Sequence, residues 1–479
     1  MKKKVNKTKP KTARKREIIE SKPEKVKISK QGLDGFFKAE NLALIGASHE
    51  INKIGNVLFK NLIKTKTVFP VNPNIDVIMN RHSFKSVLEI EDKIDMAIIA
   101  VKAELVPEVV EQCGKKKIKN VLIISSGFAE AGNEKLNEKL KNCLEKYDIK
   151  CIGPNCLGIY DAYSDLDAIF LTQQRLKRPT QGKISFISQS GALGGALLGT
   201  MADRKIGISK FVSYGNAINL NECDYLEYLG NDPETSVICV YVEQIKDGKR
   251  FLEIGKKVAK EKPIIVLKGG MTEKGNKAAM SHTGSLAGDA RIYSGILKQI
   301  GAIQVDNLED LFSVANLFDK FYELKKKIKG KKIQVITNGG GYGIICADQI
   351  EKNKLELGEL SSATVAKMKK FMPTFANIGN PMDLMGDVTN ERYRLALDAC
   401  LDDANIDLVL LVVLYQTPLI NQDLVEIISQ AQKSMKKPIV IVMNNNEFEE
   451  SIKETLEEKE AVVFEFPEDA VRAIQKFLR

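Results

Sequence analysis

The chain has 479 residues, of which 44% are hydrophobic and 28% charged, a size and composition typical of a folded protein of roughly three domains. The sequence excludes a membrane-spanning protein, because no run approaches the ~18 apolar residues that a span needs. Its eight cysteines show no paired CxxC spacing, which argues against a disulfide framework or a zinc site, predicts no bound metal, and fits a reducing cytoplasm.

The net charge of +10 comes entirely from residues 1–30, which hold thirteen Lys or Arg and three Glu. This segment has almost no apolar side chains, so it cannot offset the entropy of ordering and we expect a disordered tail. It lacks the apolar core of a signal peptide, and it is rich in lysine rather than in arginine and serine, unlike a transit peptide. A solvated tail is favoured over an electrostatic arm for RNA, a membrane or an acidic partner, so the charge does not by itself indicate a nucleic-acid-binding protein. The role of the tail stays open.

From residue 41 onward, short apolar runs alternate with amphipathic stretches, a pattern that predicts an α/β domain with a doubly wound parallel sheet. The predicted strands of this first domain, 31–158, are 42–45, 67–71, 96–101, 121–125 and 151–152, with helices at 55–65 and 105–116. A turn at Gly46 follows the first strand, where such sheets bind nucleotide-like ligands. The dinucleotide fingerprint G-x-G-x-x-G is missing, since Gly46 and Gly55 lie nine positions apart. A phosphate-bearing ligand other than NAD is therefore predicted.

Two further blocks repeat the alternation. The predicted strands are 183–187, 236–242 and 263–267 in a domain at 159–325, and 333–336, 408–414 and 438–442 in a domain at 330–479 that also has a helix at 344–352. Residues 323–332 are charged and have little to bury, so we place a domain boundary there.

The second and third blocks both open with a strand, a turn of small residues and a helix. A helix N-terminus carries unpaired N–H groups and about half a positive charge, and small residues let an anion approach the backbone closely. Each turn alone could be an ordinary tight connection, but two in one chain favour a bound phosphate. The candidate phosphate-binding residues are Ser188, Ser190, Gly191 and Ala192 in the second block and Gly340, Gly341, Tyr342 and Gly343 in the third.

His282 is one of three histidines, and it lies in a stretch rich in glycine, alanine and serine. We expect a pliant loop, on which an imidazole can act as a nucleophile, a proton carrier or a phosphate acceptor. A surface loop that happens to carry a histidine is the alternative. Glu243 closes the predicted strand 236–242, so it is a candidate for fixing one ring nitrogen of that imidazole. The alternative for Glu243 is a surface ion pair with Lys246.

Together these stretches resemble the α subunit of ADP-forming acyl-CoA synthetases of the acetyl-CoA synthetase type, within the succinyl-CoA synthetase superfamily, over about residues 32–479. The run Ser-His-Thr-Gly-Ser-Leu-Ala-Gly at 281–288 resembles the family's phosphohistidine loop. Ile-Ser-Gln-Ser-Gly-Ala-Leu at 187–193 and Thr-Asn-Gly-Gly-Gly-Tyr-Gly at 337–343 resemble its two phosphate-binding helix starts. Gly-Pro-Asn-Cys-Leu-Gly at 153–158 resembles the segment that joins its domains. The resemblance implies a CoA-binding Rossmann-like domain followed by two flavodoxin-like ligase domains, the first of which carries the phosphohistidine loop.

The resemblance also implies that the first domain binds CoA. The residues that match the family's CoA-contacting segments are Gly46, Ala47, Ser48, Lys53, Gly55, Asn72, Pro73, Val101, Ser125, Ser126, Gly127, Phe128 and Asn155. The first of these loops departs from the family pattern Gly-Ala-Ser-Arg-x-Pro-Gly-Lys, because it reads Gly-Ala-Ser-His-Glu-Ile-Asn-Lys at 46–53. His49 therefore stands where the family often has a permanent cation.

The implied reaction is acyl-CoA + ADP + phosphate ⇌ acid + ATP + CoA, through an acyl phosphate and a phosphohistidine at His282. The family holds its nucleotide in an ATP-grasp module, for which these three domains leave no room. The resemblance therefore implies a separate β subunit that carries Mg²⁺ and ADP or ATP, in an α2β2 assembly. A non-catalytic, CoA-responsive regulator of the same fold is one alternative. An NAD-linked Rossmann oxidoreductase is the other, and the missing fingerprint argues against it. The acyl group, ADP versus GDP and the direction of flux stay open.

Overall fold

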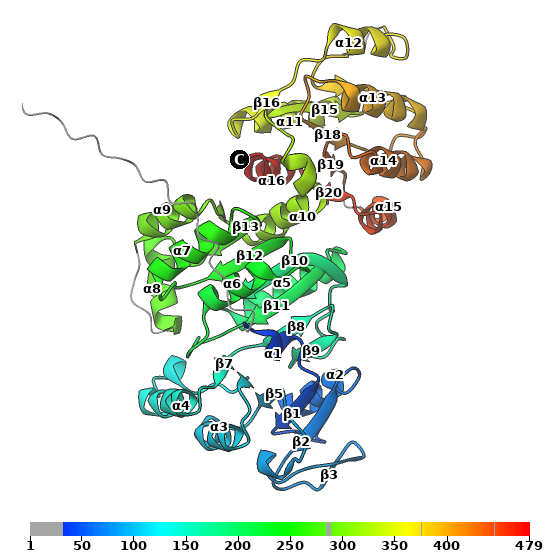
Figure 1. Ribbon diagram of the computed structural model, residues 1–479. Coiled ribbons are helices and arrows are strands. Elements are labelled where there is room, and N and C mark those ends of the chain that lie inside the picture. The colour runs from blue at the N-terminus through cyan, green and yellow to red at the C-terminus, as the bar shows by residue number, and fades with distance from the viewer. Residues whose placement is uncertain (1–31, 284–288, 375, 445) are drawn as a thin grey trace, which may run out of the picture. The chain divides into compact units, whose positions relative to one another are not determined.

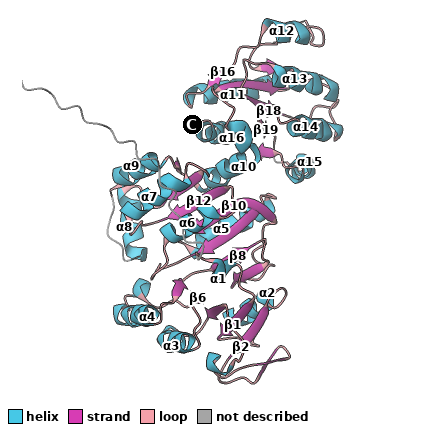
Figure 2. Cartoon of the chain, viewed as in Figure 1, coloured by secondary structure: helices cyan, strands magenta, loops and turns pink. Residues whose placement is uncertain are grey.

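Three sheets organise the computed structural model, which describes residues 32–283, 289–374, 376–444 and 446–479 (Figure 1). Figure 2 shows the strands of each sheet with helices packed around them. The predicted tail at 1–30 and residues 284–288 lie outside the described residues. Leu33–Arg479 forms one compact unit. The predicted α/β class, with mostly parallel sheets, is confirmed.

The first sheet has five parallel strands in the order β2-β1-β5-β6-β7. Its strands are β1 (Asn41–Ile45), β2 (Thr67–Val71), β5 (Met96–Ile99), β6 (Asn120–Ile123) and β7 (Lys150–Ile152), with a short ribbon of β3 (Val77–Ile78) and β4 (Arg81–His82). Its helices are α1 (Asp34–Phe37), α2 (Ile54–Leu62), α3 (Val106–Lys115) and α4 (Glu134–Lys146). All four residues of β5 are buried, as a parallel sheet covered on both faces requires. The strand order reverses between β1 and β5, and the crevice at such a reversal is where doubly wound sheets bind ligands.

The second sheet has the order β14-β13-β12-β10-β11-β8-β9. Five strands are parallel, β10 (Gln181–Ser188), β11 (Ile208–Ser213), β12 (Val237–Val242), β13 (Ile264–Lys268) and β14 (Ile303–Val305). The antiparallel hairpin of β8 (Gly158–Asp161) and β9 (Leu166–Ile169) extends one edge. The helices are α5 (Gly191–Asp203), α6 (Glu222–Asn231), α7 (Gly248–Val258), α8 (Glu273–Thr283), α9 (Ala290–Ile300) and α10 (Leu308–Lys325). The order reverses between β10 and β12. Ser188 is the last residue of β10, and Glu243 directly follows the last residue of β12.

Strand β11 was not predicted from the sequence, because Lys210 interrupts its apolar pattern. The Lys210 side chain is only 1% exposed, and its Nζ lies 2.9 Å from Asp232, 2.6 Å from Glu234 and 3.5 Å from Asp161. A buried ammonium needs such partners to offset its desolvation. Because the carboxylates come from β8 and from the turn before β12, the residues next to Lys210 do not reveal them.

The third sheet has the order β16-β15-β18-β19-β20, with β17 paired to the end of β15. Its strands are β15 (Lys332–Thr337), β16 (Glu356–Leu357), β17 (Met382–Asp383), β18 (Leu408–Val412), β19 (Ile439–Val442) and β20 (Val462–Phe464). Its helices are α11 (Gly340–Lys352), α12 (Ser362–Met368), α13 (Asn390–Asp402), α14 (Asp423–Lys433), α15 (Glu447–Glu458) and α16 (Pro467–Phe477). The order reverses between β15 and β18, so all three sheets follow the same doubly wound plan.

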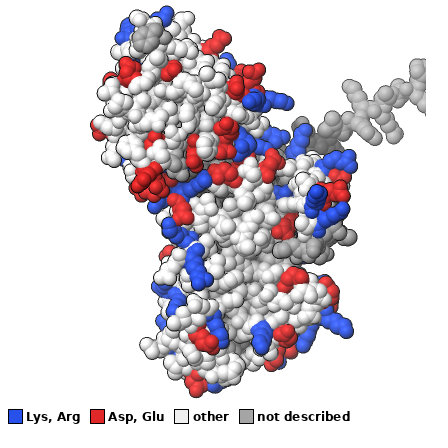
Figure 3. Space-filling model, turned by 180° about the vertical axis from the view of Figure 1, so that it is seen from behind, with Lys and Arg blue, Asp and Glu red and all other residues white. Residues whose placement is uncertain are grey.

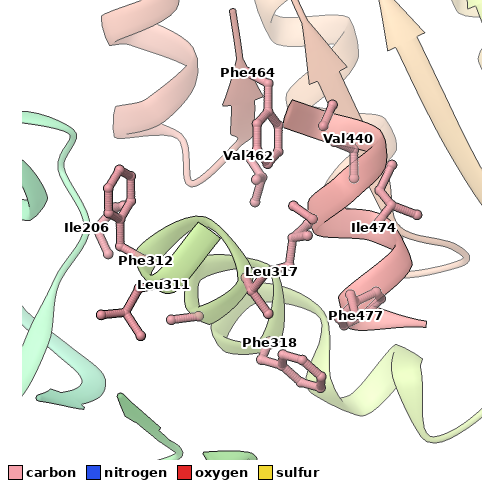
Figure 4. Close-up of a cluster of buried hydrophobic side chains, with 14 of the residues drawn as sticks. Ile206, Leu311, Phe312, Leu317, Phe318, Val440, Val462, Phe464, Ile474 and Phe477 are labelled. Atoms are coloured by element: carbon pink, nitrogen blue, oxygen red, sulfur yellow. The ribbon is translucent and has the colours of Figure 1, made fainter. Parts of the chain in front are cut away.

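Helix α10 joins the second and third sheets through one continuous hydrophobic core. Leu311 and Phe312 belong to the same buried cluster as Val462 and Phe477, and Figure 4 shows these side chains gathered around α10 and α16. The segment 323–332, predicted to be a charged linker, is helical up to Lys325, and Leu324 within it is 4% exposed. The apolar face of α10 explains why the helix continues into the charged run.

Charged side chains of both signs are interspersed on the face seen in Figure 3. Within the ranges that the structure describes, no helix combines the length and the apolar character needed to cross a membrane.

Candidate active site

A cavity of about 1030 Å³ lies between the carboxyl edge of the first sheet and the start of α5 in the second. Its volume falls at the upper end of the range usual for ligand sites. It brings together predicted residues of all three kinds, which are Val101, Ser125, Ser126 and Asn155 for CoA, Ser190, Gly191 and Ala192 for phosphate, and Glu243. These residues come from segments far apart in sequence, so the fold assembles them.

The turn after β1 is held by two close backbone approaches. Gly46 has φ +90°, and a Cβ placed on it would lie 2.3 Å from the Ala100 carbonyl oxygen. A Cβ on Gly55 would lie 1.9 Å from the Gly46 carbonyl oxygen, so no side chain fits at the start of α2. The glycines therefore let the helix end approach the turn, as the sequence pattern predicts for a phosphate-bearing ligand.

Other predicted CoA residues support this turn or lie beside it rather than lining the cavity. Asn72 Nδ2 donates to the Ala47 carbonyl at 2.8 Å, and Asn56, which the sequence analysis did not select, donates to the Ser48 carbonyl at 3.0 Å. Lys53 is exposed and paired with Glu50 at 2.5 Å. Pro73 is also exposed. A phosphate contact by Lys53 would have to compete with this exposed ion pair.

Glu130 organises the loop that follows β6, and sequence reasoning missed it. Its Oε1 accepts the Gly127 amide at 2.5 Å, and its Oε2 accepts the Phe128 amide at 3.2 Å. Asn216 Nδ2 also donates to Oε2, which ties this loop to the second sheet. Burial raises the pKa of Glu130, but the hydrogen bonds from Gly127 and Asn216 outweigh it and leave the pKa below its ordinary value. Because Asn216 is 86 positions away, no local pattern could have found this contact.

Asn155 and Ser125 stand at the meeting point of the two sheets. Asn155 adopts φ +58° and its Nδ2 donates to Asn216 Oδ1 at 3.3 Å. Ser125 Oγ donates to the Val101 carbonyl at 2.5 Å. This bond connects the loops after β5 and β6, which carry the predicted CoA residues Val101 and Ser125. The contacts fix the backbone of both loops at the edge of the cavity.

Helix α5 presents its N-terminus to the cavity. Ser190 is the N-cap, and its Oγ accepts the Leu193 amide at 3.4 Å. Ser188 is fully buried, and its Oγ donates to the Ser190 carbonyl at 2.6 Å. A Cβ on Gly191 would lie 3.3 Å from Leu157, so the first turn of α5 packs closely on that residue. The arrangement leaves first-turn amides and the helix dipole available to an anion. Ser188 is buried and stabilises the turn through its hydrogen bond to the Ser190 carbonyl.

Glu243 reaches the same cavity from the end of β12. Its backbone N–H donates to Gln189 Oε1 at 2.8 Å, and Tyr241 Oη donates to its Oε1 at 3.3 Å. Gln189 therefore joins the two strands at the reversal point, and it is a second residue that sequence reasoning missed. Lys246, the alternative ion-pair partner, donates its ammonium to the carbonyl oxygens of Asn216 at 2.9 Å and Ala217 at 3.1 Å.

His282 lies in the last turn of α8, which runs from Glu273 to Thr283. The expectation of a loop at this residue was therefore wrong for its backbone, because the preceding run with Ala278 and Ala279 favours a helix. The structure does not describe the side chain of His282 or residues 284–288, which follow the helix in the sequence.

The second small-residue turn lies at the third sheet, whereas the described residues that line the cavity all precede residue 247. Helix α11 begins at Gly340 after the N-cap Gly339, and a Cβ on Gly341 would meet nothing within 4 Å. Gly343 is buried, and Tyr342 Oη donates to Asn444 Oδ1 at 2.5 Å. The described lining of the cavity at α5 includes no residue of this helix end, and anion binding there stays a prediction.

Comparison with known proteins assigns a family to this arrangement. Family models match at residues 40–162 (CoA binding domain), 181–318 (succinyl-CoA ligase like flavodoxin domain) and 333–475 (ligase-CoA domain). The α subunit of ADP-forming acetate–CoA ligase II from Pyrococcus furiosus is 37% identical over 449 residues, which cover 92% of this chain and 96% of that relative. The chain belongs to the family of ADP-forming acetate–CoA ligases.

Relatives in this ligase family occur both as subunits and as longer single chains. The ADP-forming acetate–CoA ligase of Methanocaldococcus jannaschii is 42% identical over 353 residues, but the match covers 74% of this chain and only 49% of that relative. The acetyl-coenzyme A synthetase 1 of Ca. Korarchaeum cryptofilum, solved with phosphate and ADP, superposes with a TM-score of 0.86 at 33% identity, over 93% of this chain and 96% of that one. The predicted resemblance to this family is confirmed, and the oxidoreductase alternative finds no support in these relatives.

Proposed function

We propose that this chain is the α subunit of an ADP-forming acyl-CoA synthetase that interconverts acyl-CoA, ADP and phosphate with the free acid, ATP and CoA. The observation that carries the proposal is the cavity in which the loops after β5 and β6, the N-terminus of α5 and Glu243 meet. A CoA thioester and a phosphate can be brought together there, which is the first requirement of the reaction. The proposal keeps domain boundaries at 31–158, 159–325 and 330–479.

The geometry of the turn after β1 supports the proposal that the first sheet binds CoA. Close backbone contacts at Gly46 and Gly55 hold this turn against the start of α2. Ile54 at the start of α2 and the loops at Val101 and Ser125 line the cavity. In this proposal these loops hold the CoA portion of the substrate and direct its thioester toward α5.

The N-terminus of α5 is the proposed site of the first chemical step. Phosphate held by the amides behind Ser190 attacks the thioester carbonyl, which releases the CoA thiolate and leaves an acyl phosphate. Negative charge that spreads over the phosphoryl oxygens is stabilised by the oriented amides and by the helix dipole. Glu243 repels an anion in the same cavity, so its proposed role is to orient a nearby imidazole rather than to bind phosphate.

His282 is the proposed carrier of the phosphoryl group. One ring nitrogen attacks the phosphorus of the acyl phosphate, the P–O bond to the acyl group breaks, and the free acid leaves. A hydrogen bond from the other ring nitrogen to Glu243 would fix the tautomer and stabilise the cation that forms. The N-terminus of α11, with Gly340, Gly341, Tyr342 and Gly343, is proposed as the second anion site, used when the phosphoryl group passes to ADP.

The nucleotide half of the reaction belongs, in this proposal, to a separate β subunit. An ATP-grasp subunit would supply Mg²⁺ and the ADP or ATP site, and we propose an α2β2 assembly in the cytoplasm. The naming of the P. furiosus relative as an α subunit supports a partner of this kind.

The decisive experiment is co-expression with candidate β subunits, followed by an assay of ATP formation from a panel of acyl-CoAs. We expect ³²P to appear on the α chain, and His282→Ala to abolish both the label and ATP formation. His82→Ala is the matched control, because His82 is an exposed histidine whose ring contacts Phe84 and which does not line the cavity. Parent-like turnover of His282→Ala would refute the mechanism, and a parent complex that binds CoA but shows neither the label nor turnover would favour a non-catalytic, CoA-responsive regulator of the same fold.

A further inference from the structure

Lys246 lies in the connection that follows β12, and it is one of the residues that line the cavity. The two acceptors that the structure describes for its Nζ are backbone carbonyl oxygens, that of Asn216 at 2.9 Å and that of Ala217 at 3.1 Å. An ammonium group has three N–H donors. Beside these two bonds, Lys246 therefore has a donor left for a ligand in the cavity.

The strand order of the second sheet places this contact beside the start of α5. Strand β10, which leads into α5, lies between β12 and β11. Lys246 follows β12, whereas Asn216 and Ala217 follow β11, so the two connections meet across the carboxyl edge of β10. Neighbouring strands are only about 4.8 Å apart. The cation and the proposed phosphate site at Ser190 and Gly191 consequently share one cavity.

Hydrogen bonds fix both partners of this contact. The backbone amide of Lys246 donates at 3.3 Å to Glu222, whose side chain is buried at the start of α6. Asn216 donates its backbone amide to the Pro154 carbonyl at 3.0 Å and its side-chain amide to Glu130. A charge that is positioned before a reaction stabilises an opposite charge that develops in it without a cost of reorganisation.

The same hydrogen bonds lead from Lys246 to the loops that are proposed to hold CoA. Glu130 accepts the Gly127 amide of the loop after β6 and the side chain of Asn216, whose carbonyl accepts from Lys246. The described lining of the cavity includes Lys246 but not Gly46, the turn predicted to meet phosphate groups. A CoA thioester that reaches α5 from these loops brings its sulfur atom, rather than its phosphates, to the lysine.

We propose that the ammonium of Lys246 donates a hydrogen bond to the sulfur atom of CoA and stabilises the thiolate that leaves the thioester. The inference rests on the proposed function. A phosphate oxygen bonds to the acyl carbon, the C–S bond breaks, and its electron pair passes to sulfur. Lys246 keeps its proton, because a neighbouring cation stabilises a thiolate without protonating it. In the reverse direction the CoA thiol gives its proton to water, and the thiolate attacks the acyl phosphate.

The charges around the cavity favour Lys246 for this role. The carboxylates of Glu130 and Glu243 also line the cavity, so a thiolate formed beside phosphate needs a fixed positive charge. The other cations of the described lining are Lys102, which follows β5 of the first sheet, and Arg175, which lies between β9 and β10. Neither follows a strand next to β10, as Lys246 does.

The ionisation of bound CoA tests this inference on the chain alone. Thiolate absorbs in the ultraviolet, and desulfo-CoA, in which hydrogen replaces the thiol group, supplies the blank. At a pH below the pKa of the thiol, the parent should hold about 10-fold more of its bound CoA as thiolate than Lys246→Gln does. Lys246→Arg keeps the charge and should resemble the parent. Lys249→Gln is the matched control, because Lys249 is exposed on α7 and is not part of the described lining.

The parent chain also gives a result that needs no variant. Its bound CoA should hold a larger fraction of thiolate than free CoA does at the same pH, because the lysine lowers the pKa of the thiol. A fraction equal to or below that of free CoA would overturn the inference.

Binding and turnover distinguish this role from an anchor for another part of CoA. In Lys246→Gln, the affinity for desulfo-CoA should stay within about two-fold by calorimetry, while kcat of the complex with its β subunit should fall by about 10²-fold. If Lys246→Gln weakens desulfo-CoA as much as it lowers turnover, the inference is wrong. Unchanged thiolate in Lys246→Gln, with normal turnover of the parent, would refute this inference alone. A parent that binds neither CoA nor desulfo-CoA would refute the proposed function, and this inference with it.

Discussion

Replacing Glu130 tests the cavity directly, because this residue joins the proposed CoA loop to the second sheet. Its two oxygens accept the Gly127 and Phe128 amides and the side-chain amide of Asn216. In Glu130→Gln, one oxygen can still accept the two backbone amides, but the new amide group faces Asn216 Nδ2, so two donors oppose each other. Asn216 cannot simply turn over, since its Oδ1 already accepts from Asn155 at 3.3 Å.

The substitution thus removes one hydrogen bond to a charged acceptor, which contributes about 1.5–3 kcal/mol. At ~1.4 kcal/mol per factor of ten, the affinity for CoA should fall by about 10- to 150-fold if the loop must be ordered to bind it. Glu130 is only half-buried, and solvent screening places the expected loss toward the lower end of that range.

Titration calorimetry with CoA measures this loss. Glu138→Gln is the matched control, because Glu138 is exposed on α4 and its replacement removes the same charge. The control should bind CoA as the parent does. A Glu130→Gln variant that binds CoA within two-fold of the parent would refute the role of this residue in ordering the loop.

The same contacts predict the sign of a pH dependence. Burial raises the pKa of Glu130, but the hydrogen bonds lower it more, so the net pKa lies below 4.5. A carboxyl group with a depressed pKa contributes its stabilisation above the unfolded value and loses it as the pH falls through the folded value. The affinity difference between the parent and Glu130→Gln should therefore be full above pH 4.5 and should shrink only as the pH falls below that value.

Four further outcomes are expected. Glu243→Gln should slow phosphorylation of the chain by ~10²–10⁴-fold, and a rate within two-fold of the parent would favour a purely structural role. Gly55→Ala forces a Cβ to within 1.9 Å of the Gly46 carbonyl oxygen, so the free energy of unfolding should fall by about 1–3 kcal/mol or more and CoA binding should weaken. A Cβ on Gly295 of α9 would meet nothing within 4 Å, so Gly295→Ala should instead raise the free energy of unfolding by ~0.5–1 kcal/mol. Chemical denaturation measures the change in unfolding free energy for both glycine variants. Lys210→Met leaves buried carboxylates unpaired and should cost about 3–5 kcal/mol in the same assay.

The strand positions could be read from the sequence where a strand is uniformly apolar. The predicted strand 67–71 coincides with β2, and those at 42–45 and 438–442 differ from β1 and β19 by one residue. Strand β11 escaped because Lys210 is neutralised by carboxylates from elsewhere in the chain, so a polar residue in a strand pattern did not mean exposure. The hairpin of β8 and β9 was not predicted because it is antiparallel and lies at the edge of its sheet, outside the alternation of strands and helices from which β10, β12 and β13 were predicted.

The residues of the candidate site also fall into two groups, those that a local sequence pattern predicts and those that depend on distant partners. The turn at Gly46 and the start of α5 at Ser190 are local backbone features, and small residues mark such features in a sequence. Glu130 and Gln189 act through partners 86 and 54 positions away, and their own neighbours carry no sign of that. The helix at His282 was mistaken for a loop because small residues suit both states, and the alanines before it decide for the helix.

In each of the three sheets the strand order reverses beside the first parallel strand, and this explains why the candidate binding residues fall where they do. At each reversal of order, a small-residue turn meets the end of a neighbouring strand, and the pairs are Gly46 with Ala100, Gln189 with Glu243 and Asn338 with Leu414. Unpaired amides collect at such points, and phosphate-bearing ligands bind to them. The first two reversal points border one cavity, whereas the described lining of that cavity takes nothing from the third. In the proposed reaction, a phosphoryl group formed at α5 passes to the second anion site at α11 before it reaches ADP, so a side chain fixed inside the first cavity could complete only half of that reaction. This requirement for transfer, more than the composition of the stretch around His282, is the argument for a histidine carrier.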